Sequence, residues 1–123
     1  MFASTKPFSG FAVDDLDAAR EFYGETIGLG VRTMSEHLLA LDVGSDREIL
    51  VYAKPDHTPA TFTVLNFPVD DIDEAVDELA ARGVRFERYE TFDQDDKGIS
   101  RAGPYIAWFT DPAGNVLSVL QEA

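Results

Sequence analysis

A five-residue motif occurs twice in this chain, and the repeat limits what the chain can fold into. Val13-Asp14-Asp15-Leu16-Asp17 matches Val69-Asp70-Asp71-Ile72-Asp73, 56 residues further on. Each copy follows an apolar stretch and precedes apolar residues at helical spacing, which predicts a strand, an aspartate N-cap and a helix. We therefore predict two similar modules of strand, helix and strands within a single domain. The modules occupy about residues 1–54 and 61–123, with a linker at 55–60.

Short apolar runs with alternating faces predict three further strands after each helix. The predicted strands are 6–13, 31–34, 37–43, 49–53, 62–69 and 84–89, followed by a hairpin over 106–120, and the predicted helices run from Leu16 to Ile27 and from Ile72 to the Arg82-Gly83 pair. This order predicts an α+β fold of two βαβββ modules. The modules would form a curved, cavity-enclosing mixed sheet with the helices on its outer face.

The hairpin turns at Asp111-Pro112-Ala113-Gly114-Asn115. Pro112 fixes φ, Gly114 tolerates a positive φ, and the Asp111 carboxylate can accept hydrogen bonds from the backbone two residues on. Alternation after the turn places Ser118 on a face that is otherwise apolar.

Composition excludes several classes of function. The chain has no cysteine, so it has neither disulfides nor thiolate metal ligands. Its formal net charge of −13 disfavours binding to nucleic acid and would attract a cationic ligand, although a surface charged for solubility has the same composition. No apolar run is long enough for a membrane span, and the N-terminus does not read as a signal peptide. We expect a cytoplasmic protein.

Together these motifs resemble the vicinal-oxygen-chelate superfamily, which includes glyoxalase I, bleomycin-resistance proteins and extradiol dioxygenases. The carrying residues are the two repeat motifs, Phe22-Tyr23 with Ile27-Gly28-Leu29, Ala81-Arg82-Gly83-Val84, and the turn at 111–115. The resemblance covers the whole chain and implies paired βαβββ modules, a homodimer, and a ligand site in the concavity of the sheet. It does not fix the chemistry, because the superfamily contains enzymes and pure binding proteins.

The resemblance also implies where a metal would be held. The family's His and Glu ligands correspond to Phe8, Val64, Ser118 and a position at or near Ile49, and none of these residue types is a strong metal ligand. Glu48 would replace Ile49 if the register shifted by one residue. His37 with nearby acids could form an alternative centre, and His57 lies in the linker, where we expect it to be solvated. We predict no metal and no cofactor.

Without a metal, the concave face would be a mainly apolar pocket for a small molecule. The predicted ligand-binding residues are Phe8, Ile49, Val51, Phe62, Val64, Asn66, Ile106, Trp108 and Ser118. The alternative is that the bulky side chains fill the concavity as core. A long polar connection at 90–104 offers Asp96, Lys97 and Arg101 as lid residues, or it is a mobile solvated loop.

Three hypotheses follow. The first is a metal-independent protein that binds a small molecule, cationic or aromatic in character, as in the bleomycin-resistance branch. The second is a glyoxalase-like lyase or dioxygenase whose metal ligands are displaced from the expected positions. The third is a structural or regulatory dimer with a closed core.

Overall fold

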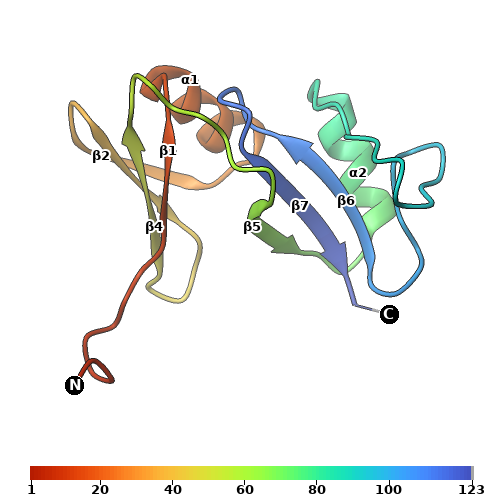
Figure 1. Cartoon of the computed structure of the whole chain (residues 1–123), viewed down its shortest axis with the longest axis horizontal. Helices are drawn as coiled ribbons and strands as arrows, with labels where there is room; N and C mark the ends of the chain where they lie inside the picture. The colour runs from red at the N-terminus through yellow and green to blue at the C-terminus, as the bar shows by residue number, and fades with distance from the viewer. Residues whose placement is uncertain (123) are drawn as a thin grey trace. The chain divides into compact units, whose positions relative to one another are not determined.

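The computed structural model describes residues 1–122 and divides into two compact units, Met1–Thr58 and Pro59–Ala123 (Figure 1). The boundary between the units falls inside the segment 55–60. Unit 1 contains β1 (Gly10–Val13), α1 (Leu16–Glu21), the π-helical turn η1 (Phe22–Thr26), β2 (Gly30–Ser35), β3 (Leu38–Asp42) and β4 (Glu48–Ala53). Unit 2 contains β5 (Thr63–Pro68), α2 (Ile72–Ala81), β6 (Tyr105–Thr110) and β7 (Val116–Gln121).

Each unit has one mixed sheet, and the fold is α+β as predicted. In unit 1 the strand order is β1-β4-β3-β2, with β1 parallel to β4 and the other pairs antiparallel. In unit 2 the order is β5-β7-β6, with β5 parallel to β7. Beyond β6, Phe86 forms a single bridge to Phe109. Unit 2 therefore repeats the strand order of unit 1, with its fourth strand reduced to one bridge.

The repeated motif builds the same helix start in both units. Asp15 (φ −135°, ψ 106°) accepts hydrogen bonds from the backbone N–H groups of Asp17 and Ala18. Asp71 (φ −136°, ψ 104°) accepts one from Glu74. These bonds satisfy N–H groups that the first turn of a helix leaves without an internal partner. The two matching N-caps confirm the repeat that the sequence predicted.

The predicted strand at 84–89 is wrong except for the bridge at Phe86. The physical reason is the side chain of Gln94, which accepts a hydrogen bond from Tyr89 N (2.7 Å) and donates one to the carbonyl of Glu87 (2.9 Å). These are backbone groups that a longer strand would pair with a neighbouring strand. The Gln94 amide therefore takes the place of the missing strand pairing.

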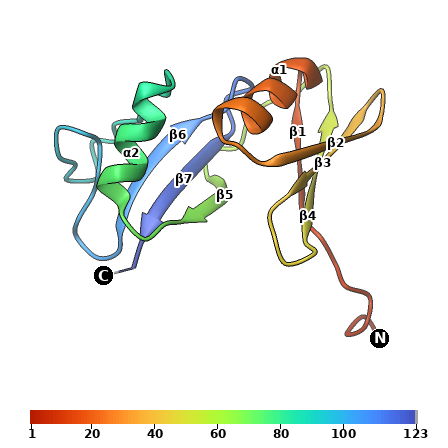
Figure 2. The same cartoon turned by 180° about the vertical axis from the view of Figure 1, so that it is seen from behind.

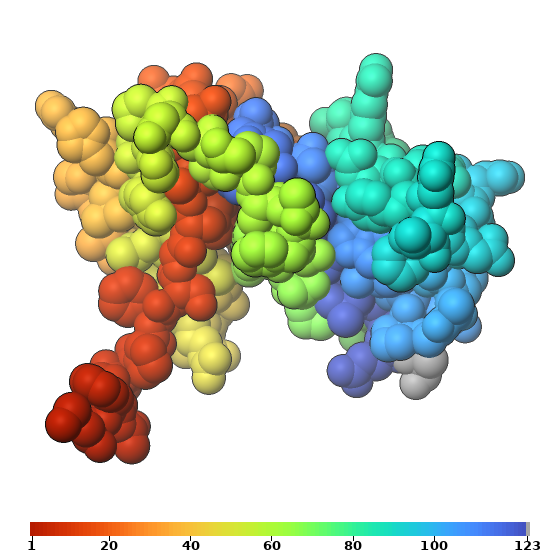
Figure 3. Space-filling model, in the orientation of Figure 1, coloured from red at the N-terminus to blue at the C-terminus, as the bar shows by residue number. Residues whose placement is uncertain are grey.

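The first strand is also shorter than predicted. Residues 1–9 form an exposed arm that precedes β1 and projects beyond the sheet of unit 1 (Figure 3). The predicted first helix is observed, but its second half is π-helical from Phe22 to Thr26. No helix within residues 1–122 is long and apolar enough to cross a membrane.

The turn between β6 and β7 is held by one buried carboxylate. Asp111 accepts hydrogen bonds from Ala113 N (2.9 Å), Asn115 N (2.9 Å) and Asn115 Nδ2 (3.0 Å). Gly114 has φ +86°, and a Cβ there would lie 3.1 Å from Pro59 Cγ, so both its backbone conformation and its surroundings require glycine. The turn motif thus fixes the register of the β6–β7 hairpin.

We predict that Asp111→Ala lowers the free energy of unfolding by about 2–4 kcal/mol, because it leaves several buried donors without an acceptor. Urea unfolding monitored by circular dichroism measures the change. Asp93→Ala, at an exposed loop position of the same unit, is the matched control and should change stability by less than about 0.5 kcal/mol. Equal stabilities of the two variants would contradict this role for the turn.

Candidate functional site

One face of each sheet is covered by the unit's own helix, and the opposite face, here called the open face, is not (Figure 2). In unit 1 the helix-covered face is marked by Phe11, whose ring lies 5.8 Å from that of Tyr23 in η1. Val51 is paired with Phe11 on one side and with Leu39 on the other, so it lies on the same face. The open face therefore carries the alternate residues of β4, which are Glu48, Leu50 and Tyr52.

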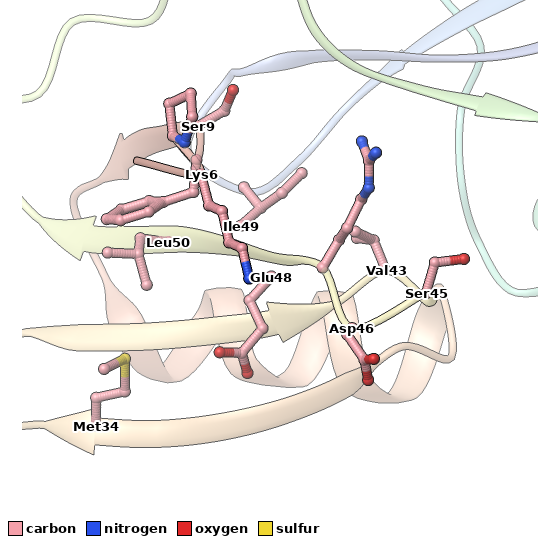
Figure 4. Close-up of a pocket in the computed structure, with 12 residues that line it drawn as sticks. Lys6, Ser9, Met34, Val43, Ser45, Asp46, Glu48, Ile49 and Leu50 are labelled. Atoms are coloured by element: carbon pink, nitrogen blue, oxygen red, sulfur yellow. The ribbon is translucent and has the colours of Figure 1, made fainter. Parts of the chain in front are cut away.

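This register places two of the predicted ligand residues on the helix-covered face. Val51 is fully buried there. Ile49 shares that face through its partner Leu41, but it lies at the end of the sheet and lines a pocket with Phe8 (Figure 4). Gly10 faces Leu50, since a Cβ built on Gly10 would lie 3.5 Å from the Cβ of Leu50. The faces of β4 are therefore exchanged relative to the prediction.

Glu48 therefore lies on the open face of β4. This is the position that Glu48 takes when the predicted register is shifted by one residue. Its carboxylate accepts a hydrogen bond from the Arg32 guanidinium at 2.7 Å and is thereby partly neutralised. His37 is exposed, and within residues 1–122 no three His, Asp or Glu side chains come together as a metal site. Phe8, Val64 and Ser118 contribute no strong donors. These residues do not fit the metal centre that the fold family implies.

In unit 2 the register brings several predicted site residues onto one face, which the repeat makes the counterpart of the open face of unit 1, because Asn66 lies 56 residues after Gly10. Ser118 is paired with Trp108 on one side and with Asn66 on the other. Ile106, two residues before Trp108, lies on the same face and is half-buried. Val64 is half-buried beside an irregularity in β5, and Phe62 precedes β5 and is 69% exposed.

Ser118 and Asn66 form the polar centre of this face. Ser118 is fully buried, and its hydroxyl donates a hydrogen bond to Asn66 Oδ1 at 2.6 Å. The amide oxygen of Asn66 is the acceptor, which leaves the amide nitrogen as a donor. Asn66 is exposed, and its Nδ2 makes no hydrogen bond within residues 1–122. The result is a positioned donor on an apolar face.

An aromatic cluster adjoins this polar centre. The Trp108 ring lies 5.4 Å from Tyr89 and 4.8 Å from Phe92, measured between ring centroids. Trp108 is nearly buried, whereas Phe92 is 48% exposed. Burial raises the pKa of Tyr89, and the charge of Glu87 adds to the shift. Tyr89 and Phe92 were not among the predicted ligand-binding residues, because Tyr89 ends the predicted strand at 84–89 and Phe92 lies in the polar connection at 90–104.

Two of the predicted lid residues are anchored on the helix side of unit 2. Lys97 pairs with Asp77 (2.9 Å) and Asp73 (3.4 Å) of α2. Arg101 pairs with Asp73 at 2.9 Å and with Asp95 at 3.2 Å. These ion pairs, here called the loop–helix clasp, hold Lys97 and Arg101 beside α2, whereas Phe92 of the same loop packs on Trp108.

The same loop is ordered by its own side chains. The Asp96 carbonyl accepts a hydrogen bond from Arg88 at 2.5 Å, and the Asp95 carbonyl accepts one at 2.6 Å. Gln94 also donates to the carbonyl of Gly98, and Ile99 and Ser100 are buried. Asp96 itself is exposed. These hydrogen bonds and the two buried residues tie the loop to the rest of unit 2 at several points.

His57 is less exposed to solvent than the sequence predicted. Its Nε2 atom is buried and has no hydrogen-bond partner within residues 1–122. The expected solvated linker histidine is therefore only half-exposed.

We predict that the loop–helix clasp weakens in acid. Burial alone would raise the pKa of Asp95, but the backbone N–H groups of Ile99 and Lys97, together with Arg101, outweigh it and lower that pKa. A hydrogen bond from Arg101 lowers the pKa of Asp73. A lowered folded-state pKa gives stability that is present above the ordinary carboxyl pKa of about 4 and is lost as pH falls below it.

Hydrogen exchange between pH 5 and pH 2.5 measures this loss. The amide of Ile99 should lose protection before the amide of Val119 in β7, because only the first depends on Asp95. In Asp95→Asn the difference between low and neutral pH should shrink. Simultaneous loss of protection at both amides, or none at Ile99, would contradict this role of the clasp.

Known proteins share this architecture. A family model described as Glyoxalase/Bleomycin resistance protein/Dioxygenase superfamily matches residues 7–119. Comparison with curated protein sequences gives no match.

Three solved structures are similar over nearly the whole chain. TnmS3, an antibiotic-binding protein from a Streptomyces species, is 24% identical with a TM-score of 0.71, and the match covers 98% of each chain. A glyoxalase family protein from Enterococcus faecalis is 22% identical with a TM-score of 0.72, covering 98% of this chain and 99% of that one. A glyoxalase/bleomycin resistance protein from Streptomyces is 25% identical with a TM-score of 0.64, covering 94% and 100%.

The likenesses to solved structures show the fold, and the family model covers most of the sequence. The repeated strand order and the matching N-caps agree with both. This chain belongs to the Glyoxalase/Bleomycin resistance protein/Dioxygenase superfamily.

Proposed function

We propose that this chain binds a small planar molecule on the open face of unit 2 and needs no metal to do so. The observation that carries the proposal is the hydrogen bond from Ser118 to Asn66 Oδ1. Where the resemblance implies a metal-binding Glu, the chain has a buried hydroxyl that is already used to orient an amide. The open face thus offers a hydrogen-bond donor in place of a metal.

The groups around Asn66 favour a planar, largely apolar ligand. With Oδ1 held by Ser118, Nδ2 remains to donate to a carbonyl or ring nitrogen. Phe92, with about half of its surface exposed, offers a ring edge or face for stacking, and Ile106 adds apolar surface. Small-molecule sites commonly combine an apolar lining with a few placed polar groups.

Two further observations support a small-molecule ligand. The formal net charge of −13 would raise the local concentration of a cationic compound near the surface. One structural neighbour, TnmS3, is an antibiotic-binding protein. We therefore include cationic aromatic compounds in the test, alongside neutral ones of the same size.

Trp108 is the chain's only tryptophan, so its fluorescence reports directly on this face. We predict that at least one planar compound bearing a carbonyl changes Trp108 emission in a saturable way. Asn66→Asp keeps an acceptor for Ser118 and replaces the donor by an acceptor. It should weaken binding of that compound about tenfold, since a lost hydrogen bond in a buried contact costs about 1.4 kcal/mol.

Arg85→Ala is the matched control for this titration. It changes the net charge by the same amount as Asn66→Asp, and Arg85 makes no side-chain bond within residues 1–122. Its affinity should equal that of the unchanged protein. A panel in which no compound alters Trp108 emission, or equal affinities of Asn66→Asp and the parent, would overturn the proposal.

The remaining expectations stay predictions. The homodimer and the cytoplasmic location are what the sequence and its resemblance imply. A metal-dependent lyase or dioxygenase would need a donor set, and no three candidate ligands come together within residues 1–122. The binding function is therefore the one that the side chains favour.

A further inference from the structure

Unit 1 contains a pocket of its own, with a volume of about 890 Å³. It lies between the N-terminal arm, the turn that precedes β4, and the beginning of β4 (Figure 4). The lining residues are Lys6, Pro7, Phe8, Ser9, Met34, Val43, Ser45, Asp46, Arg47, Glu48, Ile49 and Leu50. All of them belong to unit 1, so the pocket does not depend on the open face of unit 2.

Half of this lining is apolar. Phe8 is 70% exposed and Met34 45% exposed, whereas Ile49 and Leu50 are half-buried in the sheet. Large apolar side chains that remain this exposed in a concave region mark an interaction site more often than isolated exposed residues do. The pocket can therefore accept an apolar group.

The two cations that line the pocket, Lys6 and Arg47, differ from most Lys and Arg residues of this acidic chain because their side chains have no partner within residues 1–122. Of its ten Lys and Arg side chains, only Lys6, Arg47 and Arg85 make no ion pair or hydrogen bond within residues 1–122. Two of these three, Lys6 and Arg47, line this one pocket. Elsewhere in the chain the excess of carboxylates leaves few cations without an acidic or carbonyl partner.

The carboxylates of the lining do not form ion pairs with Lys6 or Arg47 within residues 1–122. Glu48 is paired with Arg32 at 2.7 Å, which lies outside the lining. Asp46 is the remaining acid, and it lies in the tight turn with φ +59°. Within residues 1–122, the charged side chains of the pocket that make no ion pair are thus two cations and one anion, beside an apolar floor.

We propose that this pocket binds a small amphipathic anion, an apolar chain or ring that carries a single carboxylate. The apolar body would lie on Phe8 and Leu50, with Ile49 at the edge of the pocket, and the carboxylate would pair with Lys6 or Arg47. Charge-assisted hydrogen bonds from ammonium or guanidinium to carboxylate are the strong class of such contacts. This inference is independent of the function proposed for unit 2.

Three probes with an eight-carbon chain, counting the carboxyl carbon of octanoate, separate the role of charge from that of the apolar body. They are octanoate, octan-1-ol and octyltrimethylammonium, each titrated by calorimetry. We expect octanoate to bind at one site with a Kd below about 1 mM, the alcohol at least about fivefold more weakly, and the cation not measurably. Backbone shift changes in a nuclear magnetic resonance titration should map to residues 6–9 and 43–50.

The variants test the two cations directly. A variant that combines Lys6→Ala and Arg47→Ala should bind octanoate at least about tenfold more weakly, and Phe8→Ala should bind it about threefold more weakly. Each substituted side chain is exposed, so folding should be unaffected. Arg85→Ala removes the third unpaired cation and lies outside the pocket, so it should leave the affinity unchanged.

Three results would overturn the inference: no saturable octanoate binding up to about 10 mM, equal losses in Arg85→Ala and in the variant with both Lys6→Ala and Arg47→Ala, or tighter binding of the cationic probe. Equal losses would mean that overall charge, not the pocket, holds the anion. The Trp108 titration with Asn66→Asp tests the function proposed for unit 2 separately. Either proposal can therefore fail while the other stands.

Discussion

The two faces of each sheet are divided by the alternation of side chains along its strands, and the rest of the molecule depends on that division. In unit 1 the pair Phe11 and Tyr23 marks the face that the helix covers, with Val51 and Leu39 buried beside them. Every second residue then points to the open face, whether or not it is apolar. A carboxylate at Glu48 and a hydroxyl at Ser118 therefore lie on open faces because their neighbours are needed in the two cores.

What the open faces can do follows from which polar groups are already used. Ser118 donates to Asn66 and Glu48 accepts from Arg32, and within residues 1–122 no three His, Asp or Glu side chains come together as a metal site. In unit 2 the orientation of Asn66 leaves one donor beside the aromatic cluster of Tyr89, Phe92 and Trp108. In unit 1, Lys6 and Arg47 make no ion pair within residues 1–122. These groups support the proposal that the chain recognises ligands through apolar contact, one donor and two cations.

The sequence predicted the parts of this fold that short-range patterns encode. The repeated aspartate motif predicted both N-caps, and the turn at 111–115 predicted the hairpin whose register places Ser118, Trp108 and Asn66 together. It could not predict which residues of β4 face the helix, because consecutive residues of this strand are apolar and show no alternation between polar and apolar side chains. Nor could it find the Gln94 hydrogen bonds that replace the strand at 84–89, since they join groups brought together only by the folded loop.

The open faces are proposed to recognise a ligand without a metal, and metal binding itself tests this proposal most directly. Calorimetric titration of the chelator-treated protein with Ni²⁺, Zn²⁺, Mn²⁺ and Fe²⁺ should show no stoichiometric site, in the unchanged protein and in Arg32→Ala alike, even though the latter releases Glu48. One equivalent of metal bound by the unchanged protein and lost in Glu48→Gln would contradict the account.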